Sequence, residues 1–178
     1  MHDSIEHVLL TEEQIRERIR EMGQILAKEY EGKCPIFVGI LKGVVVFFAD
    51  MVRAIPIDCQ FDFMCVSSYD GTETTGFIKV KKDLSADIAG RHVVILEDII
   101  DSGLTLKHTV EYLKSKNPAS LKICTFLDKP ERRLADLQAD YVCFTVPNEF
   151  VVGYGLDYNE SFRNLPYVGI LKPEMYTK

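Results

Sequence analysis

Long apolar runs are absent from this 178-residue sequence, and so is a recognisable secretion signal. The longest uninterrupted apolar run is 44–49, far below the roughly 20 residues that a membrane-spanning helix needs. The first residues, among them His2, Asp3 and Glu6, lack the basic stretch followed by an apolar one that begins a signal peptide. We therefore expect a cytoplasmic protein without a membrane partner.

Paired cysteines and an excess of positive charge are also missing. The chain holds 21 Lys and Arg against 27 Asp and Glu, and its formal net charge of −6 argues against a nucleic-acid partner. No G-x-G-x-x-G follows an expected strand, which disfavours a nicotinamide dehydrogenase. The cysteines lack the close paired spacing of zinc or redox motifs and are expected to be free thiols: Cys34, Cys59, Cys65, Cys124 and Cys143.

The pattern of apolar residues indicates one α/β domain that spans residues 1–178. A content of 47% hydrophobic residues is ample for a core. A capping box at 11–14 begins a helix that continues to about residue 30, and a helix over 44–55 is apolar on all sides, which predicts complete burial. A third helix is expected over 104–116. Expected strands are 35–41, 58–66, 77–82, 93–96, 120–127 and 141–144. This alternation predicts a doubly wound, mainly parallel sheet with flanking helices.

The stretch 93–105 carries the clearest chemical signal. Its apolar strand leads into Glu97 and Asp98, and ligands of open α/β sheets bind at the carboxyl ends of strands. The free N–H groups of the following helix favour an anion, so a phosphomonoester fits the turn formed by Ser102, Gly103 and Thr105. The two acids suit ribose hydroxyls or a hydrated magnesium ion.

This block resembles the phosphoribosyl-diphosphate signature of the type I phosphoribosyltransferases, in which paired acids precede a D-(S/T)-G-x-T loop. The segment 147–166 is a second long match, and it is similar to the hypoxanthine-guanine branch of that family in its short bacterial form. The matching elements run in order from Leu41 to Arg163. The resemblance implies the type I phosphoribosyltransferase fold, with a core at about 30–145. It also implies a lid at 67–76 and a small hood subdomain, formed mainly by 146–178 with the N-terminal segment.

The resemblance further implies an enzyme of purine salvage. Such an enzyme transfers the 5-phosphoribosyl group from phosphoribosyl diphosphate (PRPP) to N9 of hypoxanthine or guanine, giving IMP or GMP and pyrophosphate. The implied cofactor is Mg²⁺, and the implied assembly is a homodimer or homotetramer. The family's matching loop has a cis peptide between Leu41 and Lys42, which the sequence alone does not show.

Residue roles follow from the same resemblance. The implied catalytic residues are Asp101, Lys42, Ser68 and Tyr69, with Asp101 managing the purine proton. Ribose and PRPP would be held by Glu97, Asp98, Asp101, Ser102, Gly103, Leu104 and Thr105. Pyrophosphate would be held by Leu41, Lys42, Gly43, Arg133 and Arg163. The purine would contact Lys129, Phe150, Val151 and Asp157. The magnesium ligands would be Glu97, Asp98 and Asp157.

Three alternatives stay open at this stage. A regulator with the same fold that binds RNA is one, although the net charge counts against it. A xanthine-preferring relative is another, because the group that faces C2 is not readable from one sequence. Adenine is disfavoured, since a lysine at 129 donates hydrogen bonds and accepts none. The third concerns which of two adjacent arginines, Arg132 or Arg133, lies near pyrophosphate.

Overall fold

A computed structural model describes residues 2–68 and 78–177 and shows a six-stranded sheet in the order β4-β3-β2-β5-β6-β7. Five strands run parallel, and β4 is an antiparallel edge strand paired with β3. The strands of this sheet are β2 (Ile36–Leu41), β3 (Gln60–Ser68), β4 (Ile78–Lys82), β5 (His92–Ile100), β6 (Ser120–Asp128) and β7 (Tyr141–Thr145). The predicted α/β class with a mainly parallel sheet is confirmed.

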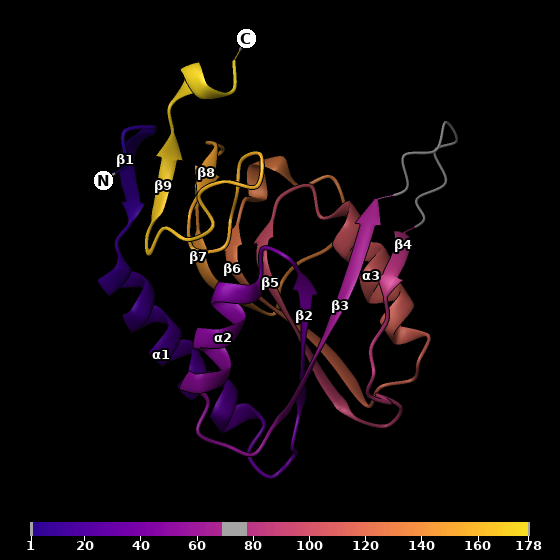
Figure 1. The fold of residues 1–178 in the computed structure, drawn as a ribbon. Coiled ribbons are helices and arrows are strands. Elements are labelled where there is room, and N and C mark those ends of the chain that lie inside the picture. Colours follow the sequence, from indigo (N-terminus) through magenta and orange to yellow (C-terminus); the bar gives the residue numbers. More distant parts are fainter. Residues whose placement is uncertain (1, 69–77, 178) are drawn as a thin grey trace.

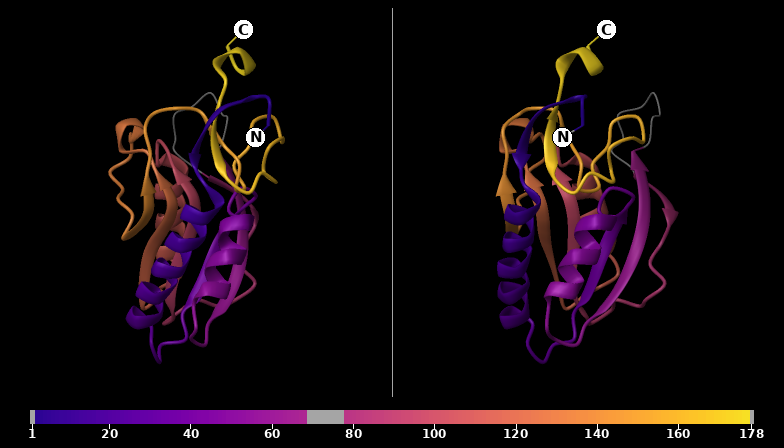
Figure 2. Two further views of the ribbon diagram at one scale, coloured as in Figure 1. Left: turned by 90° about the vertical axis from the view of Figure 1, so that its left-hand side faces the viewer. Right: turned by 60° about the vertical axis from the view of Figure 1, so that its left-hand side comes forward.

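Helices cover both faces of the sheet. The helices α1 (Glu12–Glu29) and α2 (Val45–Ala54) pack on one face, which Figures 1 and 2 show. The helix α3 (Leu104–Lys114) packs on the other. Thr11 begins α1 with the predicted capping box, in which its hydroxyl accepts from the N–H of Gln14. None of the helices in the described part of the chain is long and apolar enough to cross a membrane.

A second, three-stranded antiparallel sheet lies above the carboxyl ends of the parallel strands (Figure 1). It joins the two ends of the chain in the order β1-β9-β8, because β9 (Val168–Leu171) pairs with both β1 (Ile5–Leu10) and β8 (Val151–Val152). Two single-turn 3₁₀ helices, η1 (Pro130–Arg132) and η2 (Pro173–Met175), complete the elements. We call this sheet and its connecting loops the hood. It places the segment that begins at Phe150 over the main sheet.

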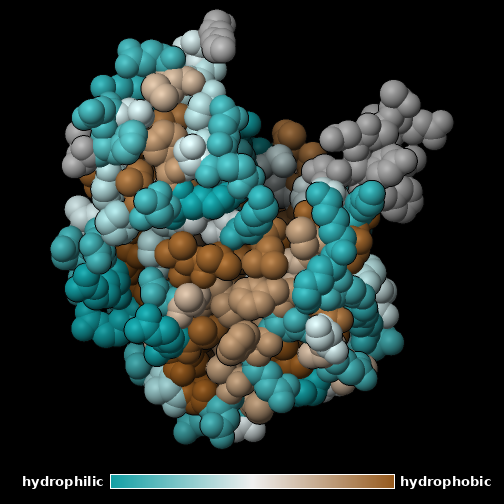
Figure 3. All heavy atoms as spheres, viewed as in Figure 1, coloured by the Kyte–Doolittle hydropathy of each residue, from teal (hydrophilic) through white to brown (hydrophobic). Residues whose placement is uncertain are grey.

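Two sequence expectations about the elements need correction. The strand at 93–96 continues to Ile100, because Ile99 and Ile100 pair with the end of β6, so the two acids lie inside β5. The helix at 44–55 is not buried on all sides: Val45 is 48% exposed. Figure 3 shows apolar side chains gathered over α2 and β3 on this face, where Phe61 is 60% exposed.

One buried contact links the hood to the helical layer. The hydroxyl of Tyr154, a hood residue that is almost completely buried, donates to the Asp50 carboxylate on α2 at 2.7 Å. Burial, followed by this carboxylate, raises the pKa of Tyr154 above its usual value. The phenol therefore stays protonated and holds the hydrogen bond throughout the neutral range.

We expect Tyr154→Phe to lower the free energy of unfolding by about 1 kcal/mol, because a buried hydrogen bond is lost while Asp50 stays partly solvated. Urea unfolding measures this change. Tyr167→Phe is the matched control, since its hydroxyl meets only the exposed N–H of His2 and should lose almost nothing. Equal effects of the two substitutions would contradict the role given to the Tyr154 contact.

Candidate active site

The turn after β5 has the geometry of an anion site. Gly103 has φ 76° and directly precedes α3, so the first N–H groups of the helix face the turn. The Ser102 hydroxyl accepts from the N–H of Leu104 at 3.4 Å. The Ser102 carbonyl accepts from the main chain at 134 and 135, which ties the turn to the segment after β6. Four predicted residues thus lie at the turn and the start of α3: Ser102, Gly103, Leu104 and Thr105.

Glu97 and Asp98 form a coupled pair of acids in the last part of β5. Among the described residues no partner reaches the buried Oε2 of Glu97. Burial, and next the neighbouring Asp98, raises the pKa of Glu97 well above its usual range. Burial also raises the pKa of Asp98 to about 6, against the opposing effect of the Ile99 N–H that donates to it. The pair is therefore arranged to receive a cation or hydroxyl donors.

The loop after β2 lies directly against this pair. The Leu41–Lys42 peptide is cis. A side chain at Gly43 would overlap the Asp98 carboxylate, and a side chain at Gly155, where φ is 100°, would overlap the Gly43 carbonyl. Glycine is required at both positions by this close approach. The loop after β2, the acids of β5 and the hood are thereby in contact.

Arg163 from the hood supplies positive charge beside the acids. Its guanidinium donates to the Gly155 carbonyl at 2.8 Å and pairs with Asp157 at 2.8 Å. Its charge favours the ionised form of Asp98. The Lys42 ammonium lies 3.1 Å from Glu160, and both side chains are well exposed. Two predicted pyrophosphate contacts, Lys42 and Arg163, therefore share Glu160 as a partner.

A cavity of about 630 Å³ lies between the end of β5, the end of β6 and the hood. It brings together all four predicted purine contacts with Asp98 and Asp101. Five further lining residues have no predicted role: Ile99, Asn148, Glu149, Leu156 and Tyr176. Leu156 could have been suspected from its place inside the matched tail, whereas Tyr176 lies ten residues beyond it. The lining residues are Asp98, Ile99, Asp101, Lys129, Arg132, Asn148, Glu149, Phe150, Val151, Leu156, Asp157 and Tyr176.

Lys129 is the buried cation of this cavity. Its side chain follows β6, the residue is only 6% exposed, and its ammonium donates to the Glu149 carbonyl at 2.6 Å. Burial lowers its pKa, and the nearby Asp101 partly opposes that shift. A buried lysine that meets a carbonyl oxygen is suited to recognise a carbonyl group of a ligand.

Arg132 and Arg133 have opposite orientations. Arg132 lines the cavity, and its Nε lies 2.6 Å from Asp101 Oδ1. Arg133 points inward, pairs with Asp128 and donates to the carbonyls of Ile100, Asp101 and Leu137. Most of its N–H groups are therefore occupied by the protein itself, and it braces the loop after β5. The structure gives no support to the pyrophosphate role predicted for Arg133.

The three predicted magnesium ligands do not form one cluster. Asp157 accepts from the N–H of Glu160 and pairs with Arg163. Across residues 2–68 and 78–177, no group of three Asp, Glu, His or Cys side chains could hold a metal ion. Glu97 and Asp98 remain as an oxygen-donor pair, which is what Mg²⁺ uses when water and ligand phosphates complete its coordination.

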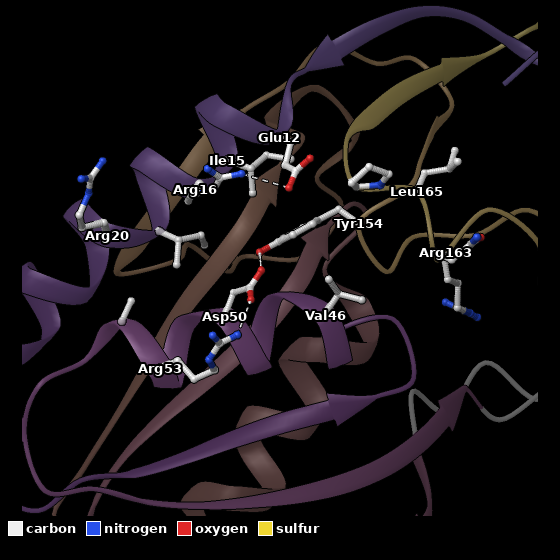
Figure 4. A pocket seen from close by; sticks show the side chains of 14 residues that line it. Glu12, Ile15, Arg16, Arg20, Val46, Asp50, Arg53, Tyr154, Arg163 and Leu165 are labelled. Atoms are coloured by element: carbon white, nitrogen blue, oxygen red, sulfur yellow. Dashed lines mark hydrogen bonds and ion pairs between the residues drawn. The ribbon is translucent and has the colours of Figure 1, made fainter. Parts of the chain in front are cut away.

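A second cavity of about 490 Å³ lies on the far side of Tyr154, between α1, α2 and the hood. Figure 4 shows Tyr154 pointing across it to Asp50, with Arg163 at its edge. Asp98, Asp101 and Lys129 line the first cavity but not this one, so we place the chemistry at the first cavity. Residues 67 and 68 of the predicted lid lie at the end of β3. Tyr69 and the remaining lid positions lie outside the described residues.

Comparisons with known proteins agree with this geometry. The sequence profile of the phosphoribosyl transferase domain matches residues 8–159, which defines the class as a phosphoribosyltransferase. The hypoxanthine-guanine phosphoribosyltransferase of Streptococcus pneumoniae is 52% identical over 178 residues and 99% of each chain. That of Lactococcus lactis is 52% identical over 98% of this chain and 96% of its own.

Solved structures of hypoxanthine phosphoribosyltransferases are also similar to this chain. A hypoxanthine phosphoribosyltransferase from Staphylococcus aureus superimposes with a TM-score of 0.96 at 51% identity, covering 100% of this chain and 97% of its own. The Trypanosoma cruzi enzyme in complex with its product IMP has a TM-score of 0.94 at 39% identity and 99% coverage of both chains. The chain belongs to the hypoxanthine-guanine phosphoribosyltransferase family. The family and the fold inferred from its motifs are thereby confirmed.

We expect Glu97→Gln to stabilise the protein at pH 7.5 by about 1 kcal/mol or more when a chelator is present. In the unfolded chain both carboxyls ionise near pH 4, whereas in the folded protein their pKa values are raised. Their favourable contribution to folding is therefore complete below about pH 4 and is lost as pH rises through about 6. Replacing Glu97 by glutamine leaves one acid in place of two, so the variant loses less stability as pH rises.

Urea unfolding of wild type and Glu97→Gln at pH 4.5 and 7.5 measures the effect. The advantage of the variant should shrink at the lower pH, where the folded wild type is already protonated. Glu31→Gln, at an exposed carboxyl, serves as the control and should show no such trend. A variant that is less stable than wild type at pH 7.5 would show that the ionised pair does not lower the free energy of unfolding.

Proposed function

We propose that this chain transfers the 5-phosphoribosyl group from PRPP to N9 of hypoxanthine or guanine, giving IMP or GMP and pyrophosphate. The observation that carries the proposal is the placement of buried Lys129 and half-exposed Phe150 in one cavity with Asp101. That cavity adjoins the turn before α3, which suits a 5′-phosphate. A base site, a pentose site and a phosphate site thus follow one another along one edge of the sheet.

The base site favours a 6-oxopurine. The Lys129 ammonium already holds a carbonyl oxygen, that of Glu149, and O6 of hypoxanthine or guanine presents the same group. The amine of adenine offers no acceptor at this position. Phe150 supplies a ring on which a flat base can stack, and Ile99 and Leu156 add apolar walls. The main chain of Val151 would meet the edge of the ring.

The pentose and diphosphate sites involve the acid pair and the two cations. Glu97 and Asp98 would hold the ribose hydroxyls and, with water and phosphate oxygens, one Mg²⁺. Bound Mg²⁺ would neutralise charge on the pyrophosphate as it leaves. Lys42 and Arg163 would bind the diphosphate oxygens, which replace Glu160 as their partner. Leu41 and Gly43 would present main-chain groups beside them.

Asp101 would manage the proton of the purine. The C1′–O bond to pyrophosphate breaks, the N9–C1′ bond forms, and the proton released from the imidazole ring of the base passes to the Asp101 carboxylate through N7. Arg132 pairs with this carboxylate at 2.6 Å and would hold it in place beside the base. Ser68 and Tyr69 remain proposed contributors to the closed site, on the family resemblance alone.

Two wider properties belong to the same proposal. We propose a homodimer or homotetramer, supported by the apolar face over α2 and β3 that carries Phe61. We also propose a cytoplasmic location, supported by five cysteines that are all free thiols. Xanthine is the alternative base, because its O6 would meet Lys129 as that of hypoxanthine does.

The first test is steady-state turnover of hypoxanthine, guanine, xanthine and adenine with PRPP, with Mg²⁺ and with a chelator. We expect Mg²⁺-dependent formation of IMP and GMP and no AMP. AMP formation at a comparable rate would contradict the role given to Lys129. A chain that turns over none of these bases would contradict the proposed activity itself.

Lys129→Met tests the base site specifically. It keeps the length of the side chain but removes the donor, so we expect kcat/KM for hypoxanthine to fall by about 10- to 100-fold, the usual loss for a hydrogen bond to a charged group. Lys114→Ala, at an exposed lysine on α3, is the control and should leave kcat/KM unchanged. Undiminished hypoxanthine turnover by Lys129→Met would remove that residue from base recognition.

A further inference from the structure

The C-terminal arm, residues 172–177, lies beside the base cavity. The arm begins at the end of β9, where the N–H of Leu171 donates to the Phe150 carbonyl and that of Lys172 donates to the Ser4 carbonyl. Three groups then converge on the Pro173 carbonyl: the N–H of Tyr176 and both the N–H and the hydroxyl of Thr177. These bonds fold the arm into the single turn η2 and fix where the Tyr176 ring lies.

Tyr176 stacks on Phe150. The two ring centroids are 5.0 Å apart and the ring planes differ by 24°, while Tyr158 meets Phe150 edge-on at 5.5 Å and 90°. Stacked and edge-on pairs are the favourable arrangements of aromatic rings. Phe150 thus packs against two aromatic rings, yet it remains 37% exposed and lines the cavity that Tyr176 also lines.

Tyr176 and the polar groups of the cavity come from different parts of the fold. Figures 1 and 2 show the arm rising beyond the end of β9, away from the main sheet. Lys129 and Asp101, in contrast, follow β6 and β5 of that sheet. The stacked Tyr176 ring covers one face of Phe150, so a base that also stacks on Phe150 must use the opposite face. A purine that uses Lys129 and Phe150 together would add a third layer to the existing pair of rings.

The geometry points to Tyr176 as a positioning residue of the purine site, which orients Phe150 so that base, Phe150 and Tyr176 form a three-layer stack. This inference rests on the proposed function, since it assumes a purine at Lys129. A flat heteroaromatic base would stack on Phe150, and the C-terminal arm would orient the Phe150 ring. The Tyr176 hydroxyl has no part in it, so the ring alone should suffice.

Calorimetric titration of the full chain with GMP tests the inference without relying on turnover. We expect Tyr176→Ala to bind GMP about 3- to 10-fold more weakly, the range of one aromatic pair, and Tyr176→Phe to bind like wild type. Met175→Ala is the matched control: it changes an equally exposed neighbour of the arm for which the structure shows no ring contact with Phe150, and it should bind like wild type. In turnover, KM for the base should rise in Tyr176→Ala while KM for PRPP stays the same.

Each other result has a distinct meaning. If wild type binds no GMP, the proposed function fails, and the inference fails with it. If wild type binds GMP and Tyr176→Ala binds it equally well, the proposed function stands and the positioning role is wrong. If Tyr176→Ala binds GMP more tightly, Tyr176 competes with the base for Phe150, and the three-layer stack is wrong. Tyr176→Leu, which keeps an apolar side chain without a ring, should resemble Tyr176→Ala and provides a second folded variant.

Discussion

Two carboxyl groups, those of Glu97 and Asp98, are held close together and partly buried at the end of the central strand β5. This arrangement disfavours the ionised forms of both carboxyls. The segments packed around the pair leave room for it and supply positive charge. Asp98 lies so close to Gly43 that the loop after β2 cannot carry a side chain there. Gly155 approaches the Gly43 carbonyl in the same way, and Arg163 adds the compensating charge. The loop after β2, the sheet and the hood are therefore fitted around one electrostatic constraint.

The antiparallel hood explains how a parallel sheet gains a complete site. The carboxyl ends of parallel strands supply the acids, the phosphate-binding turn and Lys129, but they present these groups at an open edge. The hood brings Phe150, Asp157 and Arg163 over that edge, and the Tyr154 contact with Asp50 fixes it to α2. Because β1 pairs with β9, the hood depends on contacts between residues that are far apart in the sequence.

Sequence reasoning recovered the elements with strong local signals. The capping box of α1, the apolar run that begins β5 and the turn before α3 each depend on neighbours a few residues away. The strands β1 and β9 were missed because they are short and pair residues that are far apart in the chain. The orientation of Arg132 and Arg133 depends on the single turn η1, and two adjacent arginines carry no signal that separates them. Tyr176 was missed for the same reason as β9, since its contact with Phe150 exists only in the folded chain.

The most direct test of the central role of the acid pair is whether ligand binding at pH 6 releases protons. Calorimetric titration with Mg²⁺ and PRPP in buffers of different ionisation enthalpy measures this, with Glu97→Gln/Asp98→Asn as the reference for protons that the ligand itself releases. Since the pKa of Asp98 is about 6 and that of Glu97 is also raised, a cation that binds the pair must displace protons. We predict greater proton release by wild type than by the double variant. Equal release by the two proteins would contradict the account that the buried pair receives the cation.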